Sequence, residues 1–119
     1  MKPVIAGMLV LVSLESFATN TYKCIFDSYS DAGGIHKEVL NLTFLVDESA
    51  DKAYIIGNNG SNEVAHIFRG DGRSFVEITV TGNVFVTTIT PDMQAVHSRN
   101  SVMFGDLLPS QYYGRCSSQ

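Results

Sequence analysis

The sequence predicts an all-β fold: a small antiparallel meander of seven or eight short strands, forming either a closed barrel or a two-sheet sandwich. Beyond residue 18, apolar and polar residues alternate with a period of two, and helical periodicity is absent. Glycine-containing turn sequences interrupt the alternation at short intervals, which is typical of hairpins between neighbouring strands. Cys24 and Cys116 lie near the two ends of this region, where a disulfide would join the first strand to the last.

Residues 1–18 predict a secretory signal peptide. Lys2 supplies a positive charge, residues 4–14 are mainly apolar, and small residues precede a cleavage site after Ala18. The apolar stretch is shorter than the roughly 20 residues that span a membrane, and no later segment is long enough either. We therefore expect export, of a bacterial type to the periplasm or beyond, and a single domain over residues 19–119.

Four strands are predicted in the first half of this domain, at residues 21–26, 40–46, 53–56 and 63–69. A loop is expected at residues 27–37, a polar turn at 47–51, and a hairpin turn at 57–61. This last turn contains Asn59 and Gly60, two residue types that tolerate positive φ.

The second half predicts three longer strands and a short last one, at residues 74–81, 84–90, 95–103 and 111–116. Asp71–Gly72 and Gly82–Asn83 mark the first two hairpin turns, and Pro91 suits the second position of the next. Residues 105–109 read as a loop. Because no segment could serve as a crossover helix, neighbouring strands should pair in antiparallel fashion.

Export would place both cysteines where thiols oxidise, so a Cys24–Cys116 disulfide is expected. Closing so long a loop would stabilise the fold by about 4 kcal/mol in the chain-entropy model. In a barrel, this bond would hold the first and last strands together at the seam, and closure of the barrel would remove the exposed sheet edges. An open two-sheet sandwich is the alternative.

Alternation assigns Leu40, Leu42 and Phe44 to one face of the second strand, and Val76 and Ile78 to one face of the fifth. A cavity lined by these five residues would favour a small-molecule ligand. Phe75 and Phe85 fall on the opposite faces of their hairpin. They would form an exposed partner-binding pair, unless both faces of the hairpin are buried.

The net charge of −4 and the scattered basic residues argue against binding of nucleic acid or anionic membranes. No serine-nucleophile motif occurs, and His36, His66 and His97 show no metal-ligand spacing. Paired cysteines could not act as nucleophiles. The sequence therefore predicts no catalytic residue, no cofactor and no metal site.

The candidate binding residues are near the C-terminus. His97 and Arg99 share one face of the seventh predicted strand, and Tyr112 and Tyr113 follow on the last strand. Tyrosine and arginine contribute large contact areas with a polar end and are common in recognition surfaces. In the alternative interpretation, one tyrosine plugs the barrel end and Arg99 sits on a polar outer face.

In size and layout, an exported β-domain with cysteines at its two ends is similar to periplasmic lysozyme inhibitors. The loop motif and the tryptophan-containing strand of one such family are not found, and the chain has no tryptophan. The resemblance therefore assigns no residue a role. The leading hypothesis is a non-catalytic module that binds an envelope or extracellular protein, or a small apolar ligand. The alternatives are a structural or envelope-stress protein, and a small hydrolase or metal enzyme using His66 or His97.

Overall fold

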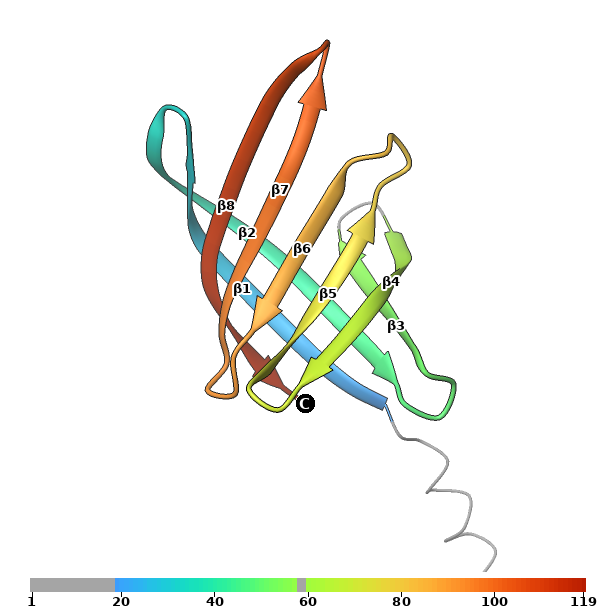
Figure 1. Cartoon of the computed structure of the whole chain (residues 1–119). Helices are drawn as coiled ribbons and strands as arrows, with labels where there is room; N and C mark the ends of the chain where they lie inside the picture. The colour runs from blue at the N-terminus through green and yellow to red at the C-terminus, as the bar shows by residue number, and fades with distance from the viewer. Residues whose placement is uncertain (1–18, 58–59) are drawn as a thin grey trace, which may run out of the picture.

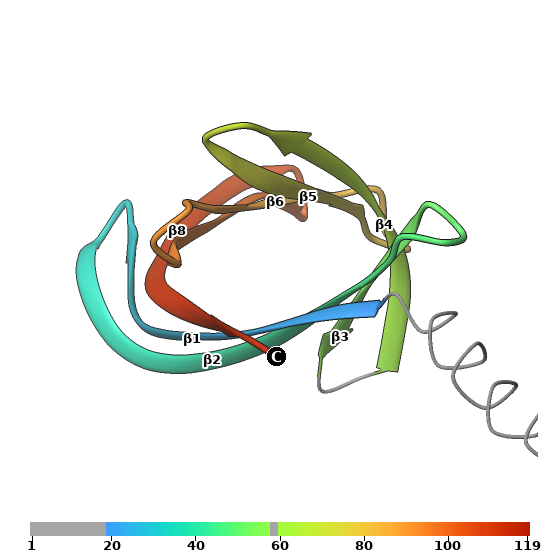
Figure 2. The ribbon, with the colours of Figure 1, turned by 90° about the horizontal axis from the view of Figure 1, so that it is seen from below.

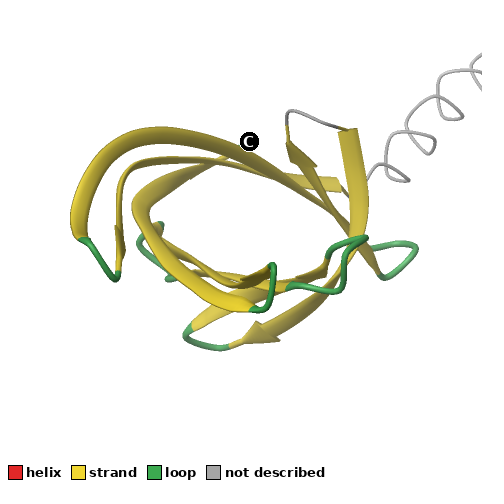
Figure 3. Cartoon of the chain, turned by 90° about the horizontal axis from the view of Figure 1, so that it is seen from above, coloured by secondary structure: helices red, strands yellow, loops and turns green. Residues whose placement is uncertain are grey.

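The chain folds into a closed barrel of eight antiparallel strands, each paired with its neighbour in sequence, with β8 returning to pair with β1. The computed structural model describes residues 19–57 and 60–119. Figure 1 shows the barrel from the side, and Figures 2 and 3 look along it from its two ends. The predicted meander is confirmed, and its form is the barrel. The strands are β1 (Thr19–Asp31), β2 (Gly34–Asp47), β3 (Lys52–Gly57), β4 (Gly60–Arg69), β5 (Gly72–Ile78), β6 (Val84–Ile89), β7 (Gln94–Met103) and β8 (Asp106–Ser118).

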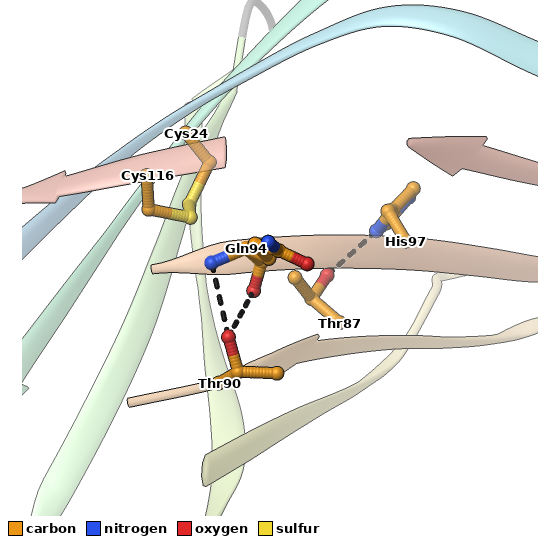
Figure 4. The surroundings of a disulfide bond; sticks show 6 residues. All are labelled: Cys24, Thr87, Thr90, Gln94, His97 and Cys116. Atoms are coloured by element: carbon orange, nitrogen blue, oxygen red, sulfur yellow. Dashed lines mark hydrogen bonds between the residues drawn. A yellow bond between two sulfur atoms is a disulfide. The ribbon is translucent and has the colours of Figure 1, made fainter. Parts of the chain in front are cut away.

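The predicted disulfide closes the barrel. Cys24 and Cys116 are direct partners across the β1–β8 pair, and their sulfur atoms are bonded (Figure 4). A few residues away, Gly114 brings the two strands unusually close, because a Cβ built there would lie 2.0 Å from the carbonyl oxygen of Ile25. We call the barrel end near the disulfide the lower end, and the end with the β1–β2 and β7–β8 turns the upper end (Figure 1).

Aromatic side chains form much of the core in the lower half of the barrel. Phe26, Phe44 and Phe75 are each almost completely buried, and the rings of Phe44 and Phe75 stack with centroids 4.4 Å apart. Tyr22 packs on Phe75 from β1, with centroids 6.3 Å apart. Buried aromatic rings contribute large apolar area, so this cluster is the main core of the fold.

The predicted loop at residues 27–37 is wrong. These residues instead extend β1 and β2 into a long hairpin that turns at Ala32–Gly33. The pairing register shifts between Phe26 and Ser28. A bulge of this kind adds one residue and reverses which positions face inward, so the simple alternation was broken at Asp27 and the strand was missed.

The predicted loop at residues 105–109 is also wrong, because β8 already begins at Asp106. The turn consists of Phe104 and Gly105 alone, with φ of 52° and 84°. Two positive φ values define the tightest hairpin turn, for which Asn-Gly is the preferred sequence. The strand was not predicted because proline is rare inside strands. Pro109 lies where β8 pairs only with β7, and such edge positions tolerate proline.

The assignment of Val76 and Ile78 to the inner face is wrong. Phe75 and Glu77 point inward instead, while Ile78 is 71% exposed on the outside. The aliphatic stripe was mistaken for the core face because one phenylalanine, whose ring is larger, determines which side is buried. Phe75 and Phe85 therefore do not form an exposed pair: Phe75 is buried and Phe85 is half-buried.

Two predictions concern residues that the structure does not describe. The signal peptide at residues 1–18 lies outside the described residues, as do positions 58–59 of the turn expected at 57–61. Gly57 and Gly60 flank that turn as a strand pair. None of the described residues forms a helix with the length and apolar character needed to cross a bilayer.

Candidate functional site

The upper half of the barrel contains a cavity of about 410 Å³. There β2 continues beyond its last pair with β3, Thr43 with Ile56, because β3 ends at Gly57. The inner wall carries apolar and polar groups from β2 to β7, namely Leu40, Leu42, Ile55, Asn62, Glu77, Phe85, His97 and Arg99.

His97 lies in the wall of this cavity and is 1% exposed. Its Nε2 accepts a hydrogen bond from Nε of Arg99 at 3.0 Å. Its Nδ1 lies 2.6 Å from the hydroxyl of Thr87, as Figure 4 shows. Because arginine can only donate, Nε2 must be unprotonated. The ring hydrogen of the neutral imidazole therefore sits on Nδ1 and is donated to Thr87.

His97 stays neutral at physiological pH. Burial, and after it the neighbouring charge of Arg99, lower the pKa of His97 from 6.5 to about 3. Both effects penalise the imidazolium, since burial removes its hydration and Arg99 repels it. The result is a fixed acceptor for Arg99 rather than a second positive charge.

Arg99 projects from β7 between two aromatic rings. The centre of its guanidinium lies 4.9 Å from the ring centroid of Phe85 and 5.0 Å from that of Tyr112. Among residues 19–57 and 60–119, no carboxylate oxygen comes within 4 Å of its nitrogen atoms. Its Nε is engaged with His97, and its two Nη groups have no hydrogen-bond acceptor among the described residues.

A carboxylate occupies the neighbouring part of the wall. Glu77 pairs with Phe85 across β5 and β6, and Phe85 pairs with Arg99 across β6 and β7. These three residues therefore form one row, with the phenyl ring between the acidic and the basic group. The amide of Asn62 donates to Glu77 at 3.1 Å and holds it in place.

Comparison with known protein families, curated proteins and solved structures finds no match for this chain. The function must therefore be argued from the geometry of the site.

The structure brings together three of the four predicted binding residues. His97, Arg99 and Tyr112 meet inside the barrel. Tyr113 points to the outside, where it is 39% exposed and its hydroxyl bonds to Ser30 and Gln111. Tyr112 and Tyr113 lie on opposite sides of the barrel wall because neighbouring residues on a strand face opposite sides.

Sequence reasoning missed Glu77, Phe85 and Thr87 as parts of the site. Glu77 lies on β5, whereas Phe85 and Thr87 lie on β6. No local sequence motif connects these residues to His97 on β7. If Phe75 is taken to face the barrel interior, every second residue of β5 and its partners on β6 face inward too. That assignment places Glu77, Phe85 and Thr87 in the interior.

The other interior histidine lies in a separate hollow of about 520 Å³ at the lower end. Arg73 stacks there on Tyr22 and Phe68, and its Nη1 lies 3.4 Å from Nε2 of His66. Burial, with a smaller contribution from Arg73, lowers the pKa of His66. His66 and His97 thus line different cavities. Within the described part of the chain, no three His, Cys, Asp or Glu residues are grouped to hold a metal ion.

The upper cavity is the better candidate for a binding site. Both hollows reach buried apolar side chains, but the described lining of the lower one includes six charged residues, namely Asp47, Glu48, Asp51, Lys52, Glu63 and Arg73. The described lining of the upper cavity has two charged residues, Glu77 and Arg99, beside the buried Leu42, Ile55 and His97. Ligand sites combine such apolar walls with a few fixed polar groups.

Proposed function

We propose that the protein is an exported, non-catalytic binding protein that takes a small, mainly apolar molecule into its upper cavity. The observation that carries this proposal is the lining of the upper cavity, where the buried apolar side chains of Leu42 and Ile55 lie beside a few fixed polar groups, among them Arg99 and His97. Eight-stranded barrels are just wide enough to hold one small ligand. A volume of about 410 Å³ lies within the usual range for such sites.

The state of His97 supports binding rather than catalysis. A general base needs a free nitrogen within reach of substrate and a pKa near the working pH. Both nitrogens of His97 are already engaged, and its pKa is lowered to about 3. The disulfide supports export, because such bonds persist mainly in oxidising compartments.

The test uses the purified protein with its disulfide intact and N-phenyl-1-naphthylamine, a neutral apolar probe that fluoresces when removed from water. We expect saturable binding at one site. Leu40→Trp should abolish it, because Leu40 lines the cavity and the indole would fill that space. Val39→Trp is the matched control, since the neighbouring Val39 is 65% exposed and absent from the cavity lining.

Equal binding by the two variants would refute the proposal. Both variants must show the cooperative melting of the unmodified protein, so that loss of fold is not read as loss of binding. If the unmodified protein does not bind the probe, a structural role or a protein partner becomes the leading hypothesis.

A further inference from the structure

We infer that the ligand carries an anionic oxygen group, of the carboxylate or sulfonate type, and that Arg99 binds it in the wall of the upper cavity. The inference rests on the proposed function and adds the ligand's chemical class and orientation. It is drawn from the geometry of Arg99, His97 and the two flanking rings.

The first argument is the state of the guanidinium charge. Arg99 is half-buried in the upper cavity, and none of the described carboxylates lies within 4 Å of it. Moving a charge away from water is costly unless an opposite charge or hydrogen bonds compensate. A ligand anion would supply both.

The second argument is geometric. Of the five N–H groups of Arg99, only that of Nε has an acceptor among the described residues, at His97. The four N–H groups on Nη1 and Nη2 remain for a ligand. Two parallel hydrogen bonds from such a fork match two oxygen atoms of one anion, which makes these contacts strong and specific.

The third argument is preorganisation. The rings of Phe85 and Tyr112 flank the guanidinium, and the chain of hydrogen bonds from Thr87 through His97 fixes its Nε. A side chain already held in one conformation loses less entropy when the ligand binds. Thr87 and His97 are thus positioning residues for Arg99.

Glu77 sets the orientation of the ligand. It follows Arg99 and Phe85 in the same row of the wall, so its carboxylate would repel an anion placed on its side. The anionic group therefore lies toward Arg99, and the apolar body of the ligand extends along Phe85, Leu42 and Ile55.

The experiment compares two probes that share one skeleton. 8-Anilinonaphthalene-1-sulfonate differs from N-phenyl-1-naphthylamine by the anionic group alone. We expect Arg99→Gln to weaken binding of the sulfonate roughly 10- to 100-fold, as for loss of charge-assisted hydrogen bonds. Binding of the neutral probe should change less than about threefold. Arg115→Gln is the matched control, because Arg115 is an exposed arginine on β8, and it should change neither.

The outcomes separate the two proposals. If neither probe binds the unmodified protein, the proposed function fails. If both bind and Arg99→Gln weakens them equally, the cavity binds ligands but the anion subsite is refuted. Should Arg99→Gln not fold, Arg99→Lys keeps the charge and loses the fork. That variant should still weaken the sulfonate several-fold relative to the neutral probe, and an unchanged ratio would overturn the inference.

The positioning role of His97 has its own readout. His97→Leu removes the acceptor for Arg99 Nε and should lower the ratio of sulfonate to neutral-probe affinity. His97→Gln offers an amide oxygen as acceptor and should restore part of that ratio. A role in packing alone would lower both affinities together in each variant and would contradict the assignment.

Discussion

Acidification should destabilise the barrel through His97. The folded protein holds this imidazole neutral, with a pKa of about 3, whereas the same group titrates near 6.5 when unfolded. Between these two values the unfolded state binds more protons than the folded state. The stabilisation from neutral His97 is therefore fully present above about pH 6.5 and is lost as the pH falls toward 3.

The size of the effect follows from the two pKa values. Each pH unit within the window costs up to about 1.4 kcal/mol of unfolding free energy for one proton. Between pH 7 and pH 4 the loss amounts to about 3 kcal/mol, because the window is entered near 6.5 and not yet left at 4. That is a large fraction of the stability of a domain of this size. His97 is 1% exposed, so solvent screens the effect little.

The assay is urea unfolding at pH 7, 6, 5 and 4, for the unmodified protein and His97→Gln. Asp31, Asp47 and His66 also have lowered pKa values and destabilise both proteins as the pH falls. The difference between the two proteins isolates His97. The difference in unfolding free energy between the two proteins should change by about 3 kcal/mol from pH 7 to pH 4, because the unmodified protein loses more stability. Parallel pH profiles, within about 1 kcal/mol, would refute the assignment of a neutral, buried His97.

Three further substitutions test the fold. Gly114→Ala should destabilise by at least about 2 kcal/mol, because its Cβ would meet the β1 backbone, whereas Gly70→Ala, with open space around it, should change the melting temperature little. Phe104→Asn should stabilise by about 0.5–1 kcal/mol, since Phe104 is 97% exposed and holds a φ of 52° that asparagine adopts more readily; a lower melting temperature would contradict this. Replacing Cys24 and Cys116 by Ser should lower the melting temperature by roughly 15–30 °C, from the loop entropy of about 4 kcal/mol; an unchanged melting curve would show that the bond contributes nothing.

The fold was predictable where strands alternate regularly and turns carry glycine. The hairpin of β5 and β6 met both conditions, and its strands lie within a few residues of their predicted bounds. The β1–β2 hairpin did not, because the shift after Phe26 reverses the inward positions and Ala32–Gly33 makes a shorter turn than expected. A bulge depends on the partner strand, so the sequence of one strand does not determine it.

The site was less predictable than the fold, for a physical reason. A barrel interior is assembled from single side chains on successive strands, so neighbours in space lie ten or more residues apart. Thr87 and His97 illustrate this: their contact depends on the β6–β7 register, in which they are direct partners. Arg99 could be singled out by residue type, but its inward position depends on closure of the barrel. Tyr113 has an equally suitable side chain and faces outward.

The contacts that stabilise the fold and the candidate binding site lie in different halves of the barrel. The disulfide, the close approach at Gly114 and the stacked rings of Phe44 and Phe75 all lie in the lower half or along the seam. Because these contacts stabilise the fold, the upper half can keep a cavity, even though unfilled volume lowers stability. The wall of that cavity holds a guanidinium oriented by neutral His97. A cavity serving only to loosen the packing would not require an oriented, half-buried charge, whereas a binding site would.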